Sequence, residues 1–302
     1  MDRFQALQVF IKVAEQGGFA AAARELGLSP PGVTRAIAGL EARLGSPLFV
    51  RTTRSVRLTS TGERFLDDAR RILADLIEAE EGAVGSHAAP RGDLRLTAPV
   101  LFGRLYVAPL LGEFLDQYDG VNAETIFVDR VVNIMEEGMD VAVRIGELPD
   151  SSLSAIRVGT VRRVTFASPD YLQEHGTPVH PTDLTQHRLI HSLAIAASGN
   201  WTFQENGKQI SVKAPQRLRM NTNDAVIELA LGGWGLSRLM SYQVAPYLGD
   251  KQLQLVLEDF ETAPLPIHIV HGQGRRAPAK VRSFVDFMVE RLRANKALNP
   301  ES

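Results

Sequence analysis

The chain has 302 residues, of which 44% are hydrophobic and 23% are charged, a balance typical of globular proteins with two or three domains. It contains no cysteine, which excludes disulfides, thiolate nucleophiles and cysteine metal ligands. The net charge of −2 hides an uneven distribution, because residues 1–60 carry eight basic and four acidic side chains and the rest carry 25 and 31. A basic segment attached to an acidic body is expected when that segment contacts phosphate.

The sequence shows no sign of export or membrane insertion. Its start, MDRFQALQVF, lacks the apolar core and small-residue cleavage site of a secretory signal. Its apolar runs are shorter than the ~18 residues that a membrane span requires. We therefore expect a cytoplasmic protein without membrane contact.

Two helices joined by a short turn are predicted in the basic segment. The alanine-rich stretch that begins at Phe19 favours a helix that Gly27 ends. A second helix is predicted over Pro30–Leu44, since Ser29 is a suitable N-cap and prolines are tolerated in a first turn. Its buried face is predicted from the spacing of four apolar residues, Val33, Ile37, Leu40 and Leu44.

This second helix should present Thr34 and Arg35 outward near its amino end. Such a pair of helices is a helix-turn-helix, whose second helix inserts its N-terminal residues into the major groove of DNA. The amides at that helix end are also expected to favour phosphate. All-helical domains that never touch DNA share this shape, so the two helices alone leave the function open.

A small hairpin is predicted over Leu48–Leu58, where apolar and polar residues alternate around Thr-Thr-Arg-Ser. Arg51 and Arg54 lie at its tip, where they are suited to phosphate or the minor groove. The hairpin and the local positive charge favour a DNA-binding head.

A long helix without proline is predicted from Thr59 onward. Apolar residues recur along it at the a and d spacing of a two-stranded coiled coil: Phe65, Ala69, Ile72, Leu76, Ala79 and Ala83. We expect this face to dimerise the chain and so provide two heads for two half-sites. The alternative is that the helix packs on its own domain. Residues 86–92 are predicted to form a hinge.

The acidic body alternates strands with helices, which is typical of parallel α/β sheets. The first block is predicted to hold strands at 93–98, 123–128 and 140–145 and helices at 102–118 and 131–137. The second block is predicted to hold strands at 164–167, 189–192, 218–221 and 235–238 and helices at 223–232 and 241–247. A strand at 266–271 and a helix at 278–295 follow, and the chain should cross between the blocks near 158–161 and 265–269.

The head resembles that of LysR-type transcriptional regulators. The matching features are a first helix at 4–14 and the motifs A-x-x-L at 23–26, S-P-P-x-V-T-R at 29–35, L-E-x-x-L-G at 40–45, L-F-x-R at 48–51 and T-x-x-G at 59–62. The resemblance covers the full length and implies an N-terminal winged helix-turn-helix, a long linker helix and a C-terminal α/β domain of two lobes, similar to type 2 periplasmic binding proteins. The boundaries then expected are 1–58 for the head, 59–90 for the linker and 91–302 for the effector domain, with lobe I at 91–161 and 267–302 and lobe II at 162–266.

The resemblance also assigns DNA contacts to named residues. On the recognition helix and its cap these are Ser29, Pro30, Pro31, Thr34 and Arg35, and on the wing they are Arg51, Thr53 and Arg54. Many family members have Gln or Ser at the position of Pro30. Base recognition should therefore depend more on Thr34, Arg35 and the wing.

In open α/β sheets a ligand lies beyond the carboxyl ends of the strands, which locates the expected effector site. In the first lobe the predicted residues are Ala98, Pro99, Val100, Leu101, Asp129, Arg144 and Gly146. In the second they are Asn221, Thr222 and Asn223, with Trp201 and Phe203 as an apolar wall. Arg144 is the first choice for holding a carboxylate effector, since a guanidinium matches a carboxylate bidentately. The alternative is that Arg144 pairs with Asp129 or Glu147.

The expected function is a transcriptional regulator that binds an operator in double-stranded DNA and responds to a small-molecule effector. Homodimers that pair into homotetramers are expected, RNA polymerase is a further candidate partner, and no cofactor is predicted. A solute-binding protein could share the two-lobe fold, but it would carry a signal sequence and no basic head. An enzyme on the same scaffold would need a partnered nucleophile or an acid–base pair, and we identify no catalytic residue. His187 and His191 lie too far apart on a strand to chelate, so no metal site is predicted.

Overall fold

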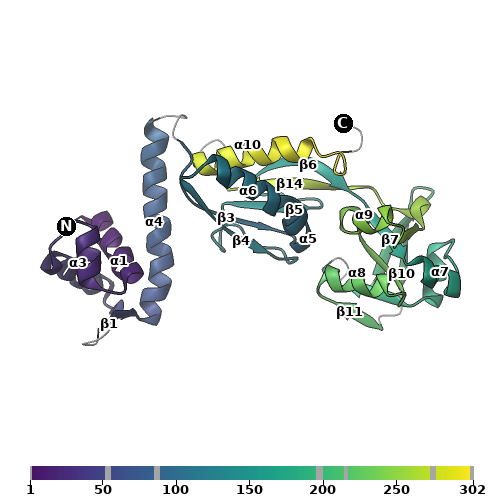
Figure 1. The fold of residues 1–302 in the computed structure, drawn as a ribbon, viewed down its shortest axis with the longest axis horizontal. Helices are drawn as coiled ribbons and strands as arrows, with labels where there is room; N and C mark the ends of the chain where they lie inside the picture. Colours follow the sequence, from purple (N-terminus) through teal and green to yellow (C-terminus); the bar gives the residue numbers. More distant parts are fainter. Residues whose placement is uncertain are drawn as a thin grey trace. The chain divides into compact units, whose positions relative to one another are not determined.

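The computed structural model describes residues 2–51, 56–84, 89–194, 200–213, 217–272 and 277–299. The chain divides into two compact units after Ala88. The first unit is the head with the long helix that follows it. The second is an α/β domain of two lobes (Figure 1).

Three helices build the head around one apolar core. They are α1 (Arg3–Gln16), α2 (Phe19–Glu25) and α3 (Pro30–Leu44). Gly17, Gly27 and Gly45 follow them in left-handed conformation, which glycine adopts at little cost. The core combines Phe10 of α1 with Ala22 and Ala23 of α2 and Ile37 of α3, all almost fully buried. The predicted helix-turn-helix is confirmed.

The predicted α3 boundaries are correct, but one buried position is wrong. Val33, Ile37 and Leu40 are buried as expected, and Ala36 joins them. Leu44 instead is 43% exposed. It is the last residue of the helix, where Gly45 already turns the chain away from the core.

The predicted hairpin is present as β1 (Phe49–Arg51) paired antiparallel with β2 (Val56–Leu58). Glu41 of α3 fixes the start of β1, because its carboxylate accepts hydrogen bonds from the amides of Leu48 (2.8 Å) and Phe49 (3.2 Å). The carboxylate of the L-E-x-x-L-G motif therefore attaches the wing to the recognition helix.

The T-x-x-G motif joins the wing to α4 (Ser60–Val84). The Thr59 hydroxyl accepts a hydrogen bond from the Gly62 amide (2.9 Å) and donates one to the Pro47 carbonyl (2.8 Å). The Thr59 amide donates to the Leu48 carbonyl (2.9 Å). A Cβ at position 62 would overlap that same carbonyl oxygen, so glycine is required by this close approach.

The first part of α4 packs on its own head. Phe65 lies 5.4 Å from Phe10 between ring centroids, and Ala69 is fully buried in the head core. Ala69 is therefore not available to a partner subunit, and for this turn the alternative of packing on the same domain is the correct one. Ile72 is 41% exposed and Leu76 is half-buried. The side chains of Ala79 and Ala83, and residues 86–88 of the predicted hinge, lie outside the described residues.

Lobe I is a five-stranded sheet in the order β4-β3-β5-β14-β6. Its strands are β3 (Gly92–Ala98), β4 (Val121–Phe127), β5 (Val141–Ile145), β6 (Ser154–Val161) and β14 (Leu265–His271). A continuous helical stretch, α5 (Val100–Phe102), η1 (Gly103–Val107) and α6 (Ala108–Gln117), shares one face of this sheet with α10 (Ala279–Arg293) (Figure 1). Phe114 of α6 and Phe284 of α10 pack edge to face at 5.1 Å.

The prediction of a helix at 131–137 is wrong. This segment forms turns instead. The Asn133 side chain accepts hydrogen bonds from the amides of Met135 (3.2 Å) and Glu136 (3.4 Å). The Glu137 carboxylate binds Arg130 through both oxygens, at 2.7 and 2.6 Å. These local bonds from polar side chains compete with a regular helix, and Gly138 in left-handed conformation ends the segment.

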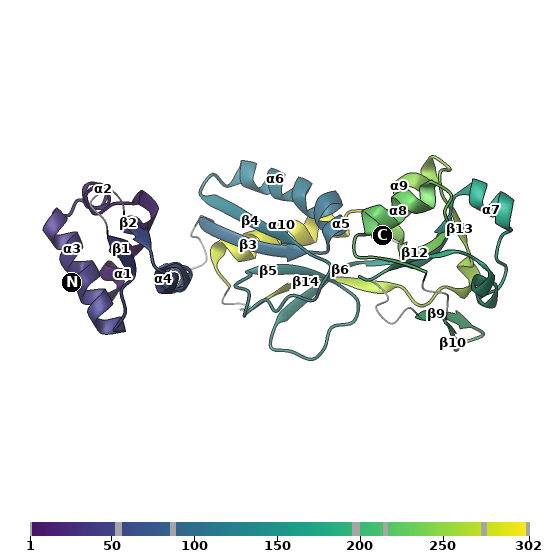
Figure 2. The same cartoon turned by 90° about the horizontal axis from the view of Figure 1, so that it is seen from below.

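Lobe II is a second five-stranded sheet in the order β11-β8-β12-β7-β13. Its strands are β7 (Arg163–Ala167), β8 (Leu189–Ser192), β11 (Leu218–Met220), β12 (Leu236–Met240) and β13 (Gln254–Val256). Figure 2 shows α8 (Asn223–Leu231) and α9 (Ser241–Gly249) on one side of it and the hairpin of β9 (Asn200–Glu205) and β10 (Lys208–Lys213) on the other. Three short helices, α7 (Pro169–His175), η2 (Pro181–Gln186) and η3 (Glu258–Phe260), complete the lobe.

Two chain crossings connect the lobes. The chain leaves lobe I after β6 and returns to it as β14, and these two strands pair with each other. Both crossings lie near the positions predicted for them. Arg162, between β6 and β7, exchanges hydrogen bonds with Ser241: its amide donates to the Ser241 hydroxyl (3.1 Å) and its carbonyl accepts from the Ser241 amide (2.8 Å).

Candidate nucleic-acid interface and effector site

The recognition helix presents the side chains that the sequence predicted. The hydroxyl of the N-cap Ser29 accepts a hydrogen bond from the Gly32 amide (3.2 Å), and Pro30 and Pro31 occupy the first two helical positions. Thr34 and Arg35 are exposed. The Thr34 hydroxyl donates to the Pro30 carbonyl (3.1 Å), so its proton is engaged and the hydroxyl can only accept a hydrogen bond from DNA.

The amino end of α3 differs from the expectation in one respect. Its first turn offers no unpaired amide to phosphate, since two positions are proline and the amides of Gly32 and Val33 both donate to the Ser29 carbonyl, at 2.8 and 3.1 Å. Phosphate contact at this end must come from side chains. Of the predicted wing residues, Thr53 and Arg54 and the side chain of Arg51 lie outside the described residues.

In lobe I, the predicted effector residues separate into buried and half-buried positions. Ala98 and Leu101 are buried in the lobe core at 2% and 1% exposure, whereas Pro99 and Val100 are half-buried at the start of α5. The Val100 amide donates to the Asp129 carboxylate (3.0 Å). Burial raises the pKa of Asp129, the Val100 bond opposes this, and the charge of Asp224 from lobe II adds to the rise.

Arg144 makes neither of the ion pairs considered from the sequence. Its guanidinium donates to the Val132 carbonyl, within the turn segment that covers this side of the sheet. Burial lowers the pKa of Arg144, which Glu137 opposes and Arg130 reinforces. Gly146 follows in positive φ and its amide donates to the Pro266 carbonyl (2.9 Å). Arg144 is therefore a half-buried cation at the carboxyl end of β5, held by a backbone carbonyl.

In lobe II, Asn221 and Thr222 are exposed and Asn223 is buried. The Asn223 side-chain oxygen accepts a hydrogen bond from Ser192 (2.6 Å), which ties the start of α8 to the carboxyl end of β8.

The apolar wall proposed for Trp201 and Phe203 is wrong. Both are buried in a second core of lobe II, at 3% and 1% exposure, with Leu189, Leu236 and Val256. They lie on the β9–β10 hairpin, which folds back over the sheet. That hairpin was not recognised from the sequence, so its alternating Trp201 and Phe203 could not be assigned to a core.

The contact between the lobes uses residues that the sequence analysis missed. Phe102 and Tyr106 of lobe I pack around Tyr242 of α9, with centroid distances of 5.4 and 6.0 Å. Arg104 pairs with Asp224 at 3.2 Å across the same boundary. Burial raises the pKa of Tyr242, and Asp129 raises it further, so the phenol stays neutral. The rule of carboxyl strand ends also predicts Tyr242, which follows β12, but in lobe II it was applied only to the end of β11.

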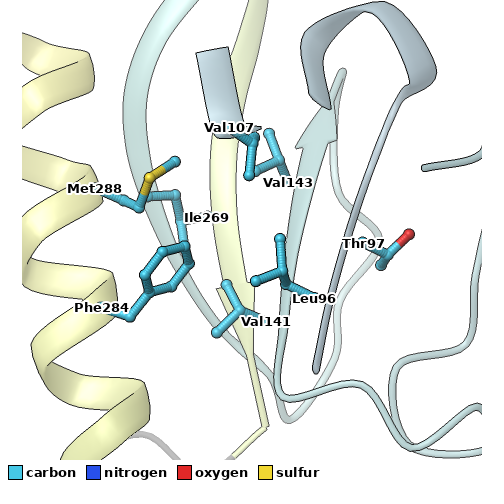
Figure 3. A pocket seen from close by; sticks show the side chains of 8 residues that line it. All are labelled: Leu96, Thr97, Val107, Val141, Val143, Ile269, Phe284 and Met288. Atoms are coloured by element: carbon cyan, nitrogen blue, oxygen red, sulfur yellow. The ribbon is translucent and has the colours of Figure 1, made fainter. Parts of the chain in front are cut away.

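One gap inside lobe I is not a ligand site. It lies between the sheet and α10 and is lined by Leu96, Thr97, Val107, Val141, Val143, Ile269, Phe284 and Met288 (Figure 3). Its free space is too small for a water molecule. The apolar side chains converge on one another while Thr97 lies apart, as expected of a packed core (Figure 3).

The fold and these sites define a class: DNA-binding proteins that carry a two-lobe regulatory domain. Two family descriptions match the chain, "Bacterial regulatory helix-turn-helix protein, lysR family" over residues 4–63 and "LysR substrate binding domain" over residues 87–293. The chain belongs to the LysR-type transcriptional regulators, and is a DNA-binding regulator with an effector-binding domain. The expected fold class is confirmed. In the described part of the chain, no helix has the length and apolar composition needed to cross a bilayer.

Relatives of known name match over nearly the whole length. An HTH-type transcriptional regulator of Xanthomonas campestris pv. campestris is 35% identical over 94% of this chain and 84% of its own. PtxR, an HTH-type transcriptional regulator of Pseudomonas aeruginosa, is 32% identical over 95% and 92%. Among solved structures, CrgA, a LysR-type transcriptional regulator from Neisseria meningitidis, matches with a TM-score of 0.62 and 28% identity over 96% and 99%. The Vibrio cholerae virulence activator AphB matches with a TM-score of 0.62 and 26% identity over 96% and 99%.

Proposed function

We propose that this regulator binds a dyad-symmetric operator as an oligomer, and that a small-molecule effector bound between the lobes of its regulatory domain changes its DNA contacts. It acts in the cytoplasm on chromosomal DNA, as a homodimer that pairs into a homotetramer, with RNA polymerase as a further partner. The observation that carries this proposal is the exposed pair Thr34 and Arg35 at the amino end of a helix with no acidic residue in its first turn.

Base reading by Arg35 is tested by comparing operator and random DNA. Arg35→Ala should weaken operator binding by about 1–3 kcal/mol and relax the preference at one base pair, because a bidentate base contact is lost. Arg51→Ala on the wing should weaken binding to all sequences alike and reduce the salt slope by about one. Binding would be measured by fluorescence anisotropy over a range of salt concentrations.

Arg43→Ala is the matched control, since Arg43 lies at the far end of the same helix. It should change operator preference little. An equal loss on operator and random DNA in Arg35→Ala would assign that residue to backbone contact. An unchanged affinity for both would remove α3 from the DNA interface.

The oligomer is proposed to use the part of α4 beyond the head core. Phe65 and Ala69 pack on the head, whereas Ile72 and Leu76 keep accessible surface. The α4 helix of a second copy would therefore pack against this helix from Ile72 onward. The contact would use the a and d positions, which continue to Ala79 and Ala83.

A carboxylate effector is proposed to bind Arg144 at the carboxyl end of β5. Its single hydrogen bond within the described residues goes to a backbone carbonyl, so its remaining donors can turn to an anion. Arg144→Ala should abolish the response of operator binding to those organic acids that alter it in the wild type, while operator affinity without acid stays within twofold. A full response in Arg144→Ala would contradict this assignment.

A further inference from the structure

Beside the two chain crossings of the regulatory domain lies a group of polar side chains, one buried and three partly buried, that the proposed effector site does not use. Arg163 lies at the start of β7, directly after the first crossing, and Glu261 and Thr262 lie just before the return as β14. Arg238 of β12 joins them from the neighbouring strand. Arg238 is opposite Thr165 in the β12–β7 register, so Arg163 is its diagonal neighbour on the same face of the sheet.

Arg238 is the central residue of this group. It is 6% exposed, and its guanidinium carbon Cζ lies over the Phe203 ring, 4.2 Å from the ring centroid. Its Nη1 donates to the Thr202 carbonyl. The Phe203 ring and the Thr202 carbonyl are the neighbours of Cζ and Nη1. The two other nitrogens of the guanidinium, Nε and Nη2, form its remaining edge.

The remaining edge of Arg238 has no partner. Both Nε and Nη2 are buried without a hydrogen bond within the described residues. These two atoms form the side-on fork of a guanidinium, whose parallel N–H bonds match the two oxygens of a carboxylate or another oxyanion. A protein that buries a charged fork without a partner loses several kcal/mol, so the arrangement points to a missing anionic partner.

The neighbouring charges do not supply that partner. Nε of Arg163 is also buried without a hydrogen bond, and neither guanidinium forms an ion pair within the described residues. The acid whose charge acts on Arg238 is Glu261: its Oε2 is taken by Arg162 at 2.9 Å, and its Oε1 is buried but forms no hydrogen bond to either guanidinium within the described residues. Burial and the charge of Arg163 together lower the pKa of Arg238 to about 10, against the opposing charge of Glu261, so Arg238 remains charged at neutral pH.

We propose that the hinge between the two lobes binds a compact oxyanion, a carboxylate, sulfate or phosphate group, in the Nε–Nη2 fork of Arg238, with Arg163 as the second cation. The site is separate from the Arg144 position, which lies on the lobe I sheet. An anion here lies beside both crossings. Its binding therefore stabilises one angle between the lobes over others.

The test is thermal unfolding of the full-length protein, followed by the fluorescence of Trp201 and Trp234 in lobe II. Sodium sulfate, phosphate and acetate are each titrated against chloride at constant ionic strength. The wild type should gain several degrees in its unfolding midpoint and saturate with at least one of these anions. Saturation with sulfate or phosphate identifies an inorganic oxyanion, and saturation with acetate alone identifies the carboxylate of an organic molecule.

Arg238→Met removes the fork while keeping an apolar side chain of similar length on Phe203, and it should abolish the saturable part of the shift. Arg163→Met should raise the half-saturating anion concentration about tenfold, equal to about 1.4 kcal/mol of binding free energy. Arg157→Met, an exposed arginine on β6, is the matched control and should behave as the wild type. Cooperative unfolding of each variant in chloride confirms that it folds.

Three results would overturn the proposal. They are a linear, non-saturating shift in the wild type, as general salting-out produces, an unchanged saturable shift in Arg238→Met, and loss of the shift in Arg144→Met alone, which would locate the anion in lobe I. None of these measurements involves DNA. Failure of the hinge site would therefore leave the regulatory function untouched, and failure of operator binding would leave this site testable.

Discussion

Gly62→Ala is expected to destabilise the head while the stability of the regulatory domain is unchanged. A methyl group at this position would overlap the Leu48 carbonyl oxygen and approach Leu58 Cδ2 to 3.0 Å. The oxygen belongs to the backbone and already accepts the Thr59 amide, so it cannot move without separating the wing from α4. The loss should be about 3 kcal/mol, at the upper end of the usual cost of overpacking.

The chain itself provides the means to assign that loss to the head. Both tryptophans, Trp201 and Trp234, lie in the regulatory domain, so their fluorescence reports on that domain and far-ultraviolet circular dichroism adds the head helices. Gly39→Ala is the control, because a Cβ there meets nothing within 4 Å and should stabilise α3 by about 1 kcal/mol. An unchanged unfolding midpoint of the head in Gly62→Ala would show that the contact between Gly62 of α4 and the Leu48 carbonyl has room for a methyl group.

Phe102→Ala should destabilise the regulatory domain by about 3–5 kcal/mol, the usual cost of removing a fully buried phenylalanine. The ring is fully buried and packs on Tyr106 of its own lobe and on Tyr242 of the other. The exposed Arg104–Asp224 ion pair cannot replace it, since such pairs contribute at most about 1 kcal/mol. The contact between the lobes therefore depends mainly on this aromatic group.

Urea unfolding followed by tryptophan fluorescence measures the effect of Phe102→Ala. Val131→Ala, at a position 88% exposed, should stay within about 0.5 kcal/mol of the wild type. Affinity for random DNA should not change, because the head and the regulatory domain are separate compact units. A loss below about 1 kcal/mol would show that the lobes move together to fill the cavity. Other residues would then be the main source of stability in the contact between the lobes.

The elements that the sequence predicted well are those whose ends are encoded locally. Ser29 followed by two prolines, and Gly45 at the other end, bound α3 within the sequence itself. Most strands of the two sheets were predicted from their alternation with helices, but β6 and β13 were not assigned as strands. The helix assigned to 131–137 failed because hydrogen bonds from Asn133 and Glu137 outweigh the apolar spacing of that segment.

The site was harder to predict, because it depends on contacts between distant segments. Trp201 is apolar whether it lines a cleft or a core, and only the fold of the β9–β10 hairpin distinguishes the two. Ala69 has the spacing of a coiled-coil position, but it is buried within its own head, where α4 packs against α1. Arg238 gives no sequence signal, since its burial results from the packing of the β9–β10 hairpin on β12.

The two prolines at the start of α3 have a consequence for how this protein responds to salt. With no amide free to hold a phosphate, the helix end contributes little beyond its weak dipole, and mobile cationic side chains must displace the counterions of DNA. The slope of operator affinity against salt concentration then measures the number of arginines engaged. A regulator of this type can be retuned to a different ionic environment by exchanging single arginines, without rebuilding the backbone that positions them.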